Sequence, residues 1–187
     1  MRDQNSVQIV ESLCGRKPQC HIDPVLLYEF PEAEHLEIAR KDYIVVYAYA
    51  DRIGEAEAKE IRKFSEAEGK KILTLGFFQP FCDEYILAEP AQVLAYIKHA
   101  DYVITDTFHG AVFSIKYQVP FAAIVRESNQ QKLQDLLERF GLEDRIAESP
   151  DSIAHILKHP MDGEKIRHLI QRERERSLNY LKENLRG

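Results

Sequence analysis

Short apolar runs alternate with amphipathic segments along most of the chain. The apolar, β-branched runs are typical of strands buried on both faces of a sheet, and they cover residues 43–50, 71–77, 101–105 and 120–125. The amphipathic periodicity predicts helices over residues 5–14, 54–68, 90–99, 108–117, 129–140, 152–158 and 163–185. Strands that alternate with helices form βαβ units. The pattern therefore predicts an α/β fold with a mostly parallel sheet flanked by helices.

The remaining segments predict loops and extended pieces. Residues 21–27 are expected to be extended and broken at Asp23-Pro24, and residues 30–41 and 78–88 are expected to be loops. Because no repeat or Gly/Ser-rich linker interrupts the chain, the simplest assignment is one Rossmann-like domain over residues 1–187. Its C-terminal helix covers about residues 163–185, and the charged run Arg172–Arg176 on that helix is expected to face solvent.

Composition and charge narrow the class of protein. Hydrophobic residues make up 44% of the 187 residues, which is enough for a packed core. A net charge of −6 argues against nucleic-acid binding. No apolar run is long enough for a transmembrane segment, and the N-terminus lacks the apolar stretch of a signal peptide, so we expect a cytoplasmic protein. The three cysteines have no metal-ligand spacing, so no metal site is expected.

The candidate chemistry lies in residues 100–114, ADYVITDTFHGAVFS, where a buried strand ends in a turn and a helix begins. In open α/β sheets, ligands bind at the carboxyl ends of the strands. Thr107 or Asp106 can cap the new helix, whose first N–H groups and dipole favour an anion. His109 in this first turn is the candidate acid–base group, and Gly110 allows a ligand to approach the backbone closely. The alternative is a histidine at a helix start with no chemical role.

Two arginines are candidates for binding an anion. Arg2 is followed by the first predicted helix, and Arg126 follows the predicted strand over residues 120–125, so both can bind a carboxylate or phosphate. A surface role for either arginine remains open at this stage. Of the other histidines, His21 is placed near a strand end, and the remaining five are expected at the surface. No G-x-G-x-x-G follows any predicted strand, so the dinucleotide-binding fingerprint is absent.

The run at residues 100–114 resembles the polysaccharide pyruvyl transferase family, whose members carry A-D-x-(V/I)-(I/V)-(T/S)-(D/S)-(S/T)-(F/R)-H-G. Three further segments match in order. Residues 2–6, RDQNS, resemble the family's R-D-x-x-S. Residues 23–27, DPVLL, resemble its D-P-x-L-L, and residues 119–145 resemble its closing strand and helix. The resemblance spans about residues 2–146.

This resemblance implies a two-domain GT-B architecture in which R-D-x-x-S falls near the middle. Here that segment begins at Arg2, so the chain is expected to be the C-terminal half, with an N-terminal half of the parent enzyme as its partner. The implied reaction transfers pyruvate from phosphoenolpyruvate to a sugar or lipid-linked oligosaccharide of a cell-surface polysaccharide, without a cofactor. The implied location is the cytoplasm or the inner face of the membrane.

The resemblance also implies roles for the candidate residues. His109 is the expected acid–base group or phosphate donor, and Arg2 is the expected clamp for the donor. Thr107 and the N–H of Gly110 complete the anion site, and Asp106 and Arg126 are the remaining expected substrate-binding residues.

Two other functions remain open. The same fold binds nucleotide sugars in GT-B glycosyltransferases, and Glu127 is then the candidate partner for a ribose. A non-catalytic domain that binds a glycan or a protein partner is the second alternative. A His109 packed into the core, with no cleft beside it, would favour that second alternative.

Overall fold

The computed structural model describes residue 1 and residues 3–185. Within that part of the chain, five strands form one parallel sheet in the order β3-β2-β1-β4-β5. In chain order the strands are β1 (Tyr43–Tyr47), β2 (Lys71–Leu75), β3 (Glu84–Ile86), β4 (Tyr102–Thr105) and β5 (Phe121–Ala123). The predicted α/β architecture with a parallel sheet is therefore confirmed.

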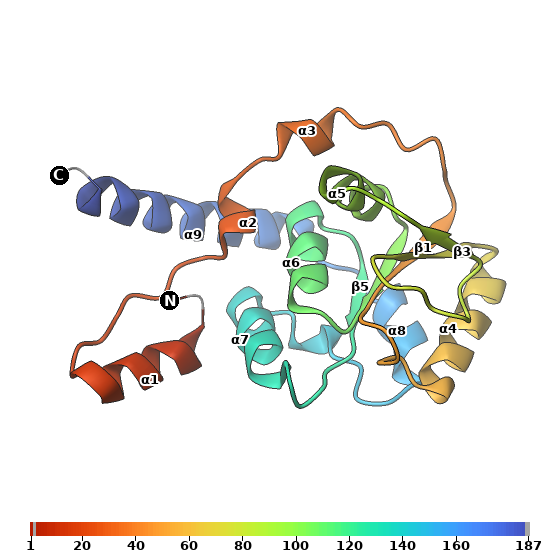
Figure 1. Ribbon diagram of the computed structural model, residues 1–187, viewed down its shortest axis with the longest axis horizontal. Coiled ribbons are helices and arrows are strands. Elements are labelled where there is room, and N and C mark those ends of the chain that lie inside the picture. The colour runs from red at the N-terminus through yellow and green to blue at the C-terminus, as the bar shows by residue number, and fades with distance from the viewer. Residues whose placement is uncertain (2, 186–187) are drawn as a thin grey trace.

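Helices surround the sheet and account for most of the remaining chain (Figure 1). The α-helices of the described residues are α1 (Gln4–Cys14), α2 (Pro24–Leu27), α3 (Pro31–Glu34), α4 (Glu55–Glu68), α5 (Pro90–Lys98), α6 (Phe108–Tyr117), α7 (Gln130–Phe140), α8 (Ser152–Lys158) and α9 (Gly163–Asn184). A short 3-10 turn covers Glu143–Arg145.

The alternation of side chains along β1 divides the core into two layers. Tyr43 and Val45 point to the layer that also contains buried residues of α5, α6 and α7. Ile44 and Val46 point to the opposite layer, which is built from buried residues of α4 and α8. Because both faces of the strand are covered, these four positions are apolar or aromatic and fully buried.

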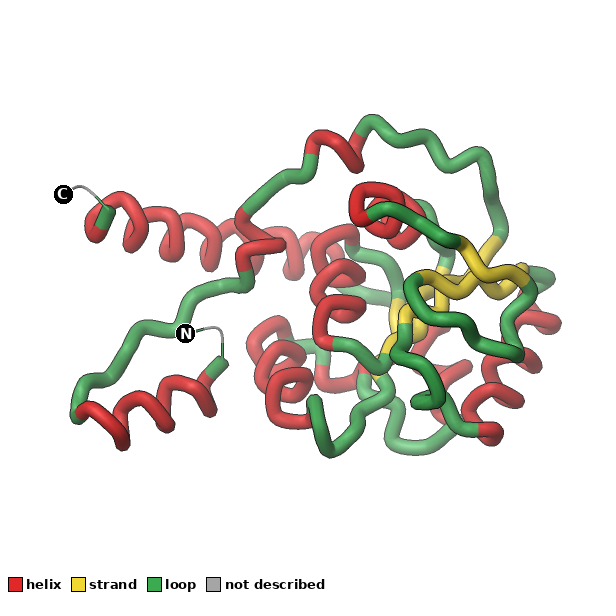
Figure 2. The backbone as a smooth tube through the Cα atoms, viewed as in Figure 1, coloured by secondary structure: helices red, strands yellow, loops and turns green. Residues whose placement is uncertain are grey.

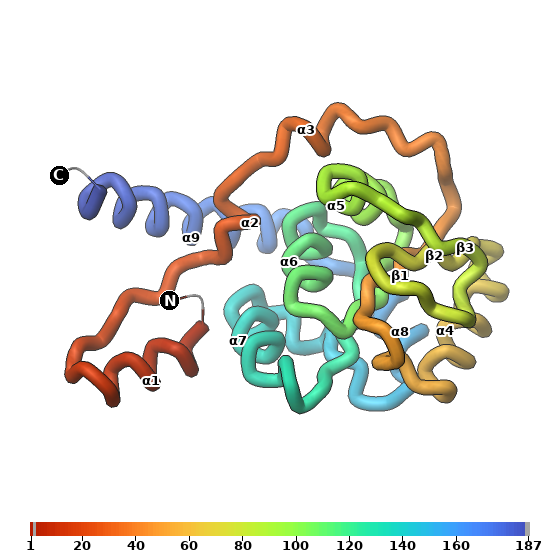
Figure 3. Tube along the Cα trace, viewed as in Figure 1, coloured from red at the N-terminus to blue at the C-terminus, as the bar shows by residue number. Residues whose placement is uncertain are grey.

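Helices α1 and α9 lie on the same side of the molecule, away from the sheet (Figure 3). Helix α9 runs outward from the body of the domain, and α1 packs against α7. Asn5 Nδ2 donates to Gln131 Oε1 at 3.0 Å, and the N–H of Gln4 donates to Asp135 Oδ2 at 2.9 Å. The first helix is therefore attached to the domain mainly through polar contacts.

Several segments differ from the sequence prediction (Figure 2). Strands β1 and β2 end before Ala48 and Gly76, so the last residues of both apolar runs lie in loops. Asp23-Pro24 begins helix α2, because the Asp23 carboxylate accepts the N–H of Val25 at 3.0 Å and proline suits the first helical position. Residues 31–34 form helix α3, and the short, polar strand β3 lies in a segment predicted to be a loop.

The charged run on the last helix is only partly solvent-facing, so the prediction for Arg172–Arg176 is wrong at one position. Glu173 is buried and forms an ion pair with Arg139 of α7. The neighbouring Ser177 is also buried, and its hydroxyl accepts the N–H of Ile22 at 3.2 Å. These contacts fix α9 against α7 and the segment that precedes α2.

Candidate functional site

The strand order places a topological switch point between β1 and β4. From β1 the chain moves outward to β2 and β3, and then crosses back to β4 and β5 on the other side. Crevices at the carboxyl ends of such neighbouring strands are where open α/β sheets bind ligands. A hollow of about 70 Å³ lies at this edge. Its lining comes from the ends of three strands and comprises Tyr47, Ala48, Tyr49, Gly76, Phe77, Thr107 and His109.

Two threonines shape the turn that leads from β4 into α6. The Thr105 hydroxyl donates to the Tyr47 carbonyl oxygen at 2.6 Å and accepts the N–H of Thr107 at 3.0 Å. The Thr107 hydroxyl oxygen accepts the N–H of Gly110 at 2.9 Å, which makes Thr107 the N-cap of α6. Of the two capping candidates, Thr107 therefore caps the helix, and it also lines the hollow.

Gly110 lies where the neighbouring atoms leave no room for a side chain. A Cβ atom at this position would lie 2.1 Å from Thr105 Oγ1 and 2.9 Å from Thr107 Oγ1. The space that a side chain would need is therefore filled by the two threonines of the turn. The Gly110 N–H, expected to face a ligand, donates to the Thr107 cap in this structure. The geometry thus gives Gly110 a steric role in shaping the turn.

His109 is solvent-exposed and lines the hollow. Its ring lies 5.5 Å from the Phe108 ring and 5.9 Å from the Phe113 ring, measured between centroids. Neither ring nitrogen is hydrogen-bonded to another described residue. The imidazole is therefore open to a ligand in the hollow, and it is not packed into the core.

Asp106 is fully buried, so its carboxylate does not line the hollow. Its Oδ1 accepts the N–H of Tyr49 at 3.0 Å, and its Oδ2 lies 2.8 Å from Arg52 Nε. Burial raises the pKa of Asp106, whereas the Tyr49 N–H and the guanidinium groups of Arg52 and Arg126 act in the opposite direction. Asp106 thus supports the loop after β1, and any contact with substrate would need this pairing to open.

Arg126 lies at the same edge of the sheet, but its guanidinium is engaged. Its Nη2 lies 2.5 Å from Glu57 Oε2 of α4 and donates to the Arg52 carbonyl oxygen at 2.5 Å. Glu127 is exposed on the following loop. Arg2, the expected clamp, lies outside the described residues.

Three residues near the site were not among the sequence candidates. Tyr49 and Phe77 come from the final residues of two apolar runs, which were predicted to continue as strands. Arg52 follows β1 in the way that Arg126 follows β5, so the same argument from strand ends could have found it. Its Nη2 donates to Ser128 Oγ at 2.8 Å, and its Cζ lies 5.5 Å from the centroid of the Tyr49 ring.

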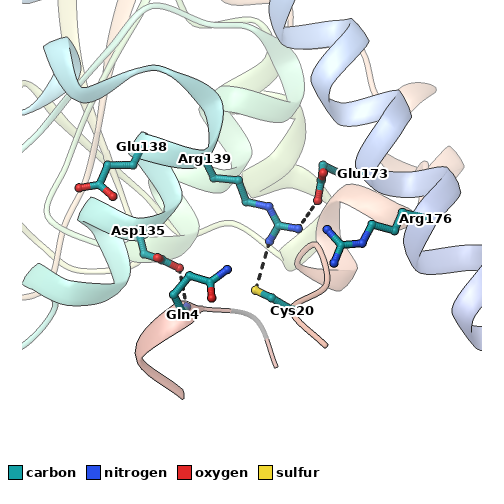
Figure 4. A pocket seen from close by; sticks show the side chains of 7 residues that line it. All are labelled: Gln4, Cys20, Asp135, Glu138, Arg139, Glu173 and Arg176. Atoms are coloured by element: carbon teal, nitrogen blue, oxygen red, sulfur yellow. Dashed lines mark hydrogen bonds and ion pairs between the residues drawn. The ribbon is translucent and has the colours of Figure 1, made fainter. Parts of the chain in front are cut away.

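A larger hollow of about 380 Å³ lies between α1, α7 and α9, away from the strand ends (Figure 4). Among its charged groups, Arg139 and Glu173 form an ion pair. Asp135 accepts the N–H of Gln4, and Arg139 contacts both Glu173 and Cys20. The residues that line this hollow connect the N-terminal segment to the domain, and none of them lines the hollow beside His109.

The described residues provide neither a metal site nor a membrane-spanning helix. In residues 1 and 3–185, no three His, Cys, Asp or Glu side chains gather in an arrangement that could hold a metal ion. None of the helices in this range is both long and apolar enough to cross a membrane.

The strand order defines a Rossmann-like α/β fold, and the switch point with the open His109 is its candidate ligand site. The family described as polysaccharide pyruvyl transferase matches residues 1–129. The chain therefore belongs to this family, as the resemblance predicted. Curated proteins gave no significant match.

Solved structures are also similar to this chain. The glycotransferase of kitacinnamycin is 12% identical over 76% of this chain and 41% of its own, with a TM-score of 0.52. The glycosyltransferase SnogD from Streptomyces nogalater is 17% identical over 87% of this chain and 45% of its own, with a TM-score of 0.48. The chain thus spans less than half of either structure. At this identity the likeness to the glycotransferase of kitacinnamycin concerns the fold alone.

Proposed function

We propose that this domain takes part in transferring the pyruvyl group of phosphoenolpyruvate to a sugar of a polysaccharide, forming a cyclic ketal. One observation carries the proposal. In a chain of the polysaccharide pyruvyl transferase family, His109 stands unpaired and exposed beside a hollow at the topological switch point. The hollow is far smaller than the roughly 300–1,000 Å³ of a pocket that encloses a whole ligand. The hollow can therefore enclose only part of the donor or of the acceptor sugar.

The chemistry requires an acid–base group and a cationic clamp. A proton adds to the methylene carbon of the enolpyruvyl group, and a sugar hydroxyl then bonds to C2 and loses its proton. The bond between C2 and the phosphate oxygen breaks, and phosphate leaves with the electron pair. A second hydroxyl bonds to C2, loses its proton and closes the ring. His109 would supply the first proton and accept the one that the attacking hydroxyl loses.

The donor carries a carboxylate and a phosphate, so it needs positive charge and N–H donors. We assign the clamp to Arg2 and the anion site to the start of α6, where the Thr107 cap fixes the first turn. Gly110, Asp106 and Arg126 act in this scheme by holding the turn and the adjoining loops in place.

The family resemblance supports an acceptor that is a sugar or a lipid-linked oligosaccharide. We propose that an N-terminal half of the parent enzyme covers the edge at which His109 lies and completes the cleft. Catalysis would then require both halves, with the reaction in the cytoplasm or at the inner face of the membrane.

Replacement of His109 tests the proposal directly. In the parent polypeptide with phosphoenolpyruvate and acceptor, H109A should lower kcat by more than about tenfold, which is more than about 1.4 kcal/mol in the barrier. Phosphate release and the mass gained by the acceptor measure the reaction. H168A, at an exposed position of α9, is the matched control and should retain wild-type activity. A smaller loss in H109A would remove His109 from the mechanism. Thermal stabilisation by nucleotide sugars, without any by phosphoenolpyruvate, would favour a nucleotide-sugar transferase instead.

A further inference from the structure

Two aromatic rings stand half-exposed beside His109. Tyr49 is 48% exposed and Phe77 is 46% exposed, although both lie at the ends of deeply buried strands. Their ring centroids are 5.5 Å apart with an angle of 53° between the planes, and both rings line the same hollow as His109. Neither the acid–base role of His109 nor the clamp role of Arg2 requires two exposed aromatic rings at this place.

The position of Tyr49 is fixed on several sides. Its N–H donates to buried Asp106 at 3.0 Å, and its carbonyl oxygen accepts Nε2 of buried Gln79 at 3.0 Å. The guanidinium of Arg52 lies over its ring, and Asp106 and Ser128 hold that guanidinium in turn. A ring that is anchored in this way while half-exposed is ready to bind with little loss of conformational entropy.

Phe77 is placed by a tight turn after β2. Gly76 has a φ of 83°, a conformation that residues other than glycine rarely adopt, and the chain bends there immediately before Phe77. The Phe77 carbonyl oxygen accepts the hydroxyl of the fully buried Thr74 at 2.7 Å. The backbone of Phe77 is therefore tied to β2 while its ring stays at the surface.

The shape and chemistry of this surface fit a pyranose ring. A pyranose has a face of C–H groups that packs on aromatic rings and a rim of hydroxyls that needs polar partners. Beside the two rings, the hollow presents the imidazole of His109 and the side chain of Thr107. A hollow of about 70 Å³ does not enclose a sugar, so the sugar would lie across its aromatic rim. A docked protein would instead need an interface of roughly 1,000 Å² or more, far beyond two rings.

We infer that Tyr49 and Phe77 form the stacking surface for the acceptor sugar and thereby present a hydroxyl of that sugar to His109. The identity of the sugar as the pyruvyl acceptor rests on the proposed function. The binding of a pyranose by these rings does not, because it can be measured without phosphoenolpyruvate. The acceptor would accordingly be held, at least in part, by the same domain that carries the acid–base group.

Titration of the ¹⁵N-labelled chain with methyl glycosides of glucose, galactose, mannose and N-acetylglucosamine tests this inference by NMR. We expect at least one glycoside to shift the amide signals of Tyr49 and Phe77. Y49A and F77A should each weaken the binding by about fivefold or more, whereas Y49F, which keeps the ring, should stay within about twofold.

Phe78 provides a matched control on the same loop. It is 63% exposed, packs against Tyr85 and does not line the hollow, so F78A should bind like the wild type. The inference is overturned if no glycoside shifts these signals at concentrations up to about 100 mM, or if Y49A and F77A bind as tightly as F78A. Failure of phosphoenolpyruvate to bind in a separate calorimetric titration would count against the proposed reaction and leave sugar binding standing.

Discussion

Substitution of Gly110 by alanine tests the packing that places His109. In most helices this exchange is favourable, because alanine has the higher helix propensity by about 1 kcal/mol. Here the added Cβ would lie 2.1 Å from Thr105 Oγ1 and 2.7 Å from Thr105 Cβ. Neither atom can move easily, because Thr105 is fully buried and its hydroxyl is bonded to the Tyr47 carbonyl oxygen.

The expected cost follows from these contacts. Overpacking of a core costs about 1–3 kcal/mol, and displacing the buried hydroxyl from its partners adds about 1–3 kcal/mol. After subtraction of the gain in propensity, G110A should lower the free energy of unfolding by about 1–5 kcal/mol. For an m-value of about 2 kcal/mol/M, urea unfolding should then show the midpoint lowered by about 0.5–2.5 M with an unchanged m-value.

G54A is the matched control for this experiment. Gly54 precedes α4 with a φ of −74°, and a Cβ there would meet nothing nearer than the flexible Glu57 carboxylate at 3.5 Å. Its free energy of unfolding should stay within about 1 kcal/mol of the wild type. If G110A is as stable as G54A, the turn can yield to a side chain, and the steric account of Gly110 is wrong.

Two further predictions concern Arg2 and His21. R2A should raise the Kd for phosphoenolpyruvate by about tenfold or more in calorimetry, and an unchanged Kd would refute its role as the clamp. Both ring nitrogens of His21 are buried without a partner, and burial, together with the positive N-terminus and Arg176, lowers its pKa below the model-peptide value of 6.5. His21 therefore binds a proton more readily in the unfolded chain than in the folded one, so its contribution to stability is most favourable above about pH 6.5 and declines as the pH drops below it. H21F should lose less stability than the wild type between about pH 7.5 and about pH 5.5 in urea unfolding, and equal losses would contradict this account.

Local sequence patterns predicted most elements well, because their causes lie within a few residues. Helix α6 begins and ends where the periodicity placed it. The carboxylate of Asp3 accepts the N–H of Ser6, and Gly15 ends α1 with a φ of 65°. Strand β3 was missed because three residues of mixed polarity carry no pattern of their own, and pairing with β2 alone makes them a strand.

The candidate site was predicted in part. The strand, turn and helix around His109 follow from a continuous stretch of sequence, whereas the structure decided that Thr107 and not Asp106 caps the helix. The engagement of Arg126 with Glu57 and the burial of Asp106 against Arg52 could not be predicted. Both depend on which loops meet at the edge of the sheet.

By itself, the sequence determined most of the elements and a histidine at the start of a helix, because these depend on contacts between near neighbours in the chain. The tertiary structure alone decided the strand order, and with it the neighbours of His109. Since that order places β1 between β2 and β4, Tyr49 and Phe77 become part of the hollow although they are many residues away from His109 in the chain. For the same reason, Glu173 is buried within a run of charges that would otherwise face solvent, because α7 supplies Arg139 as its partner.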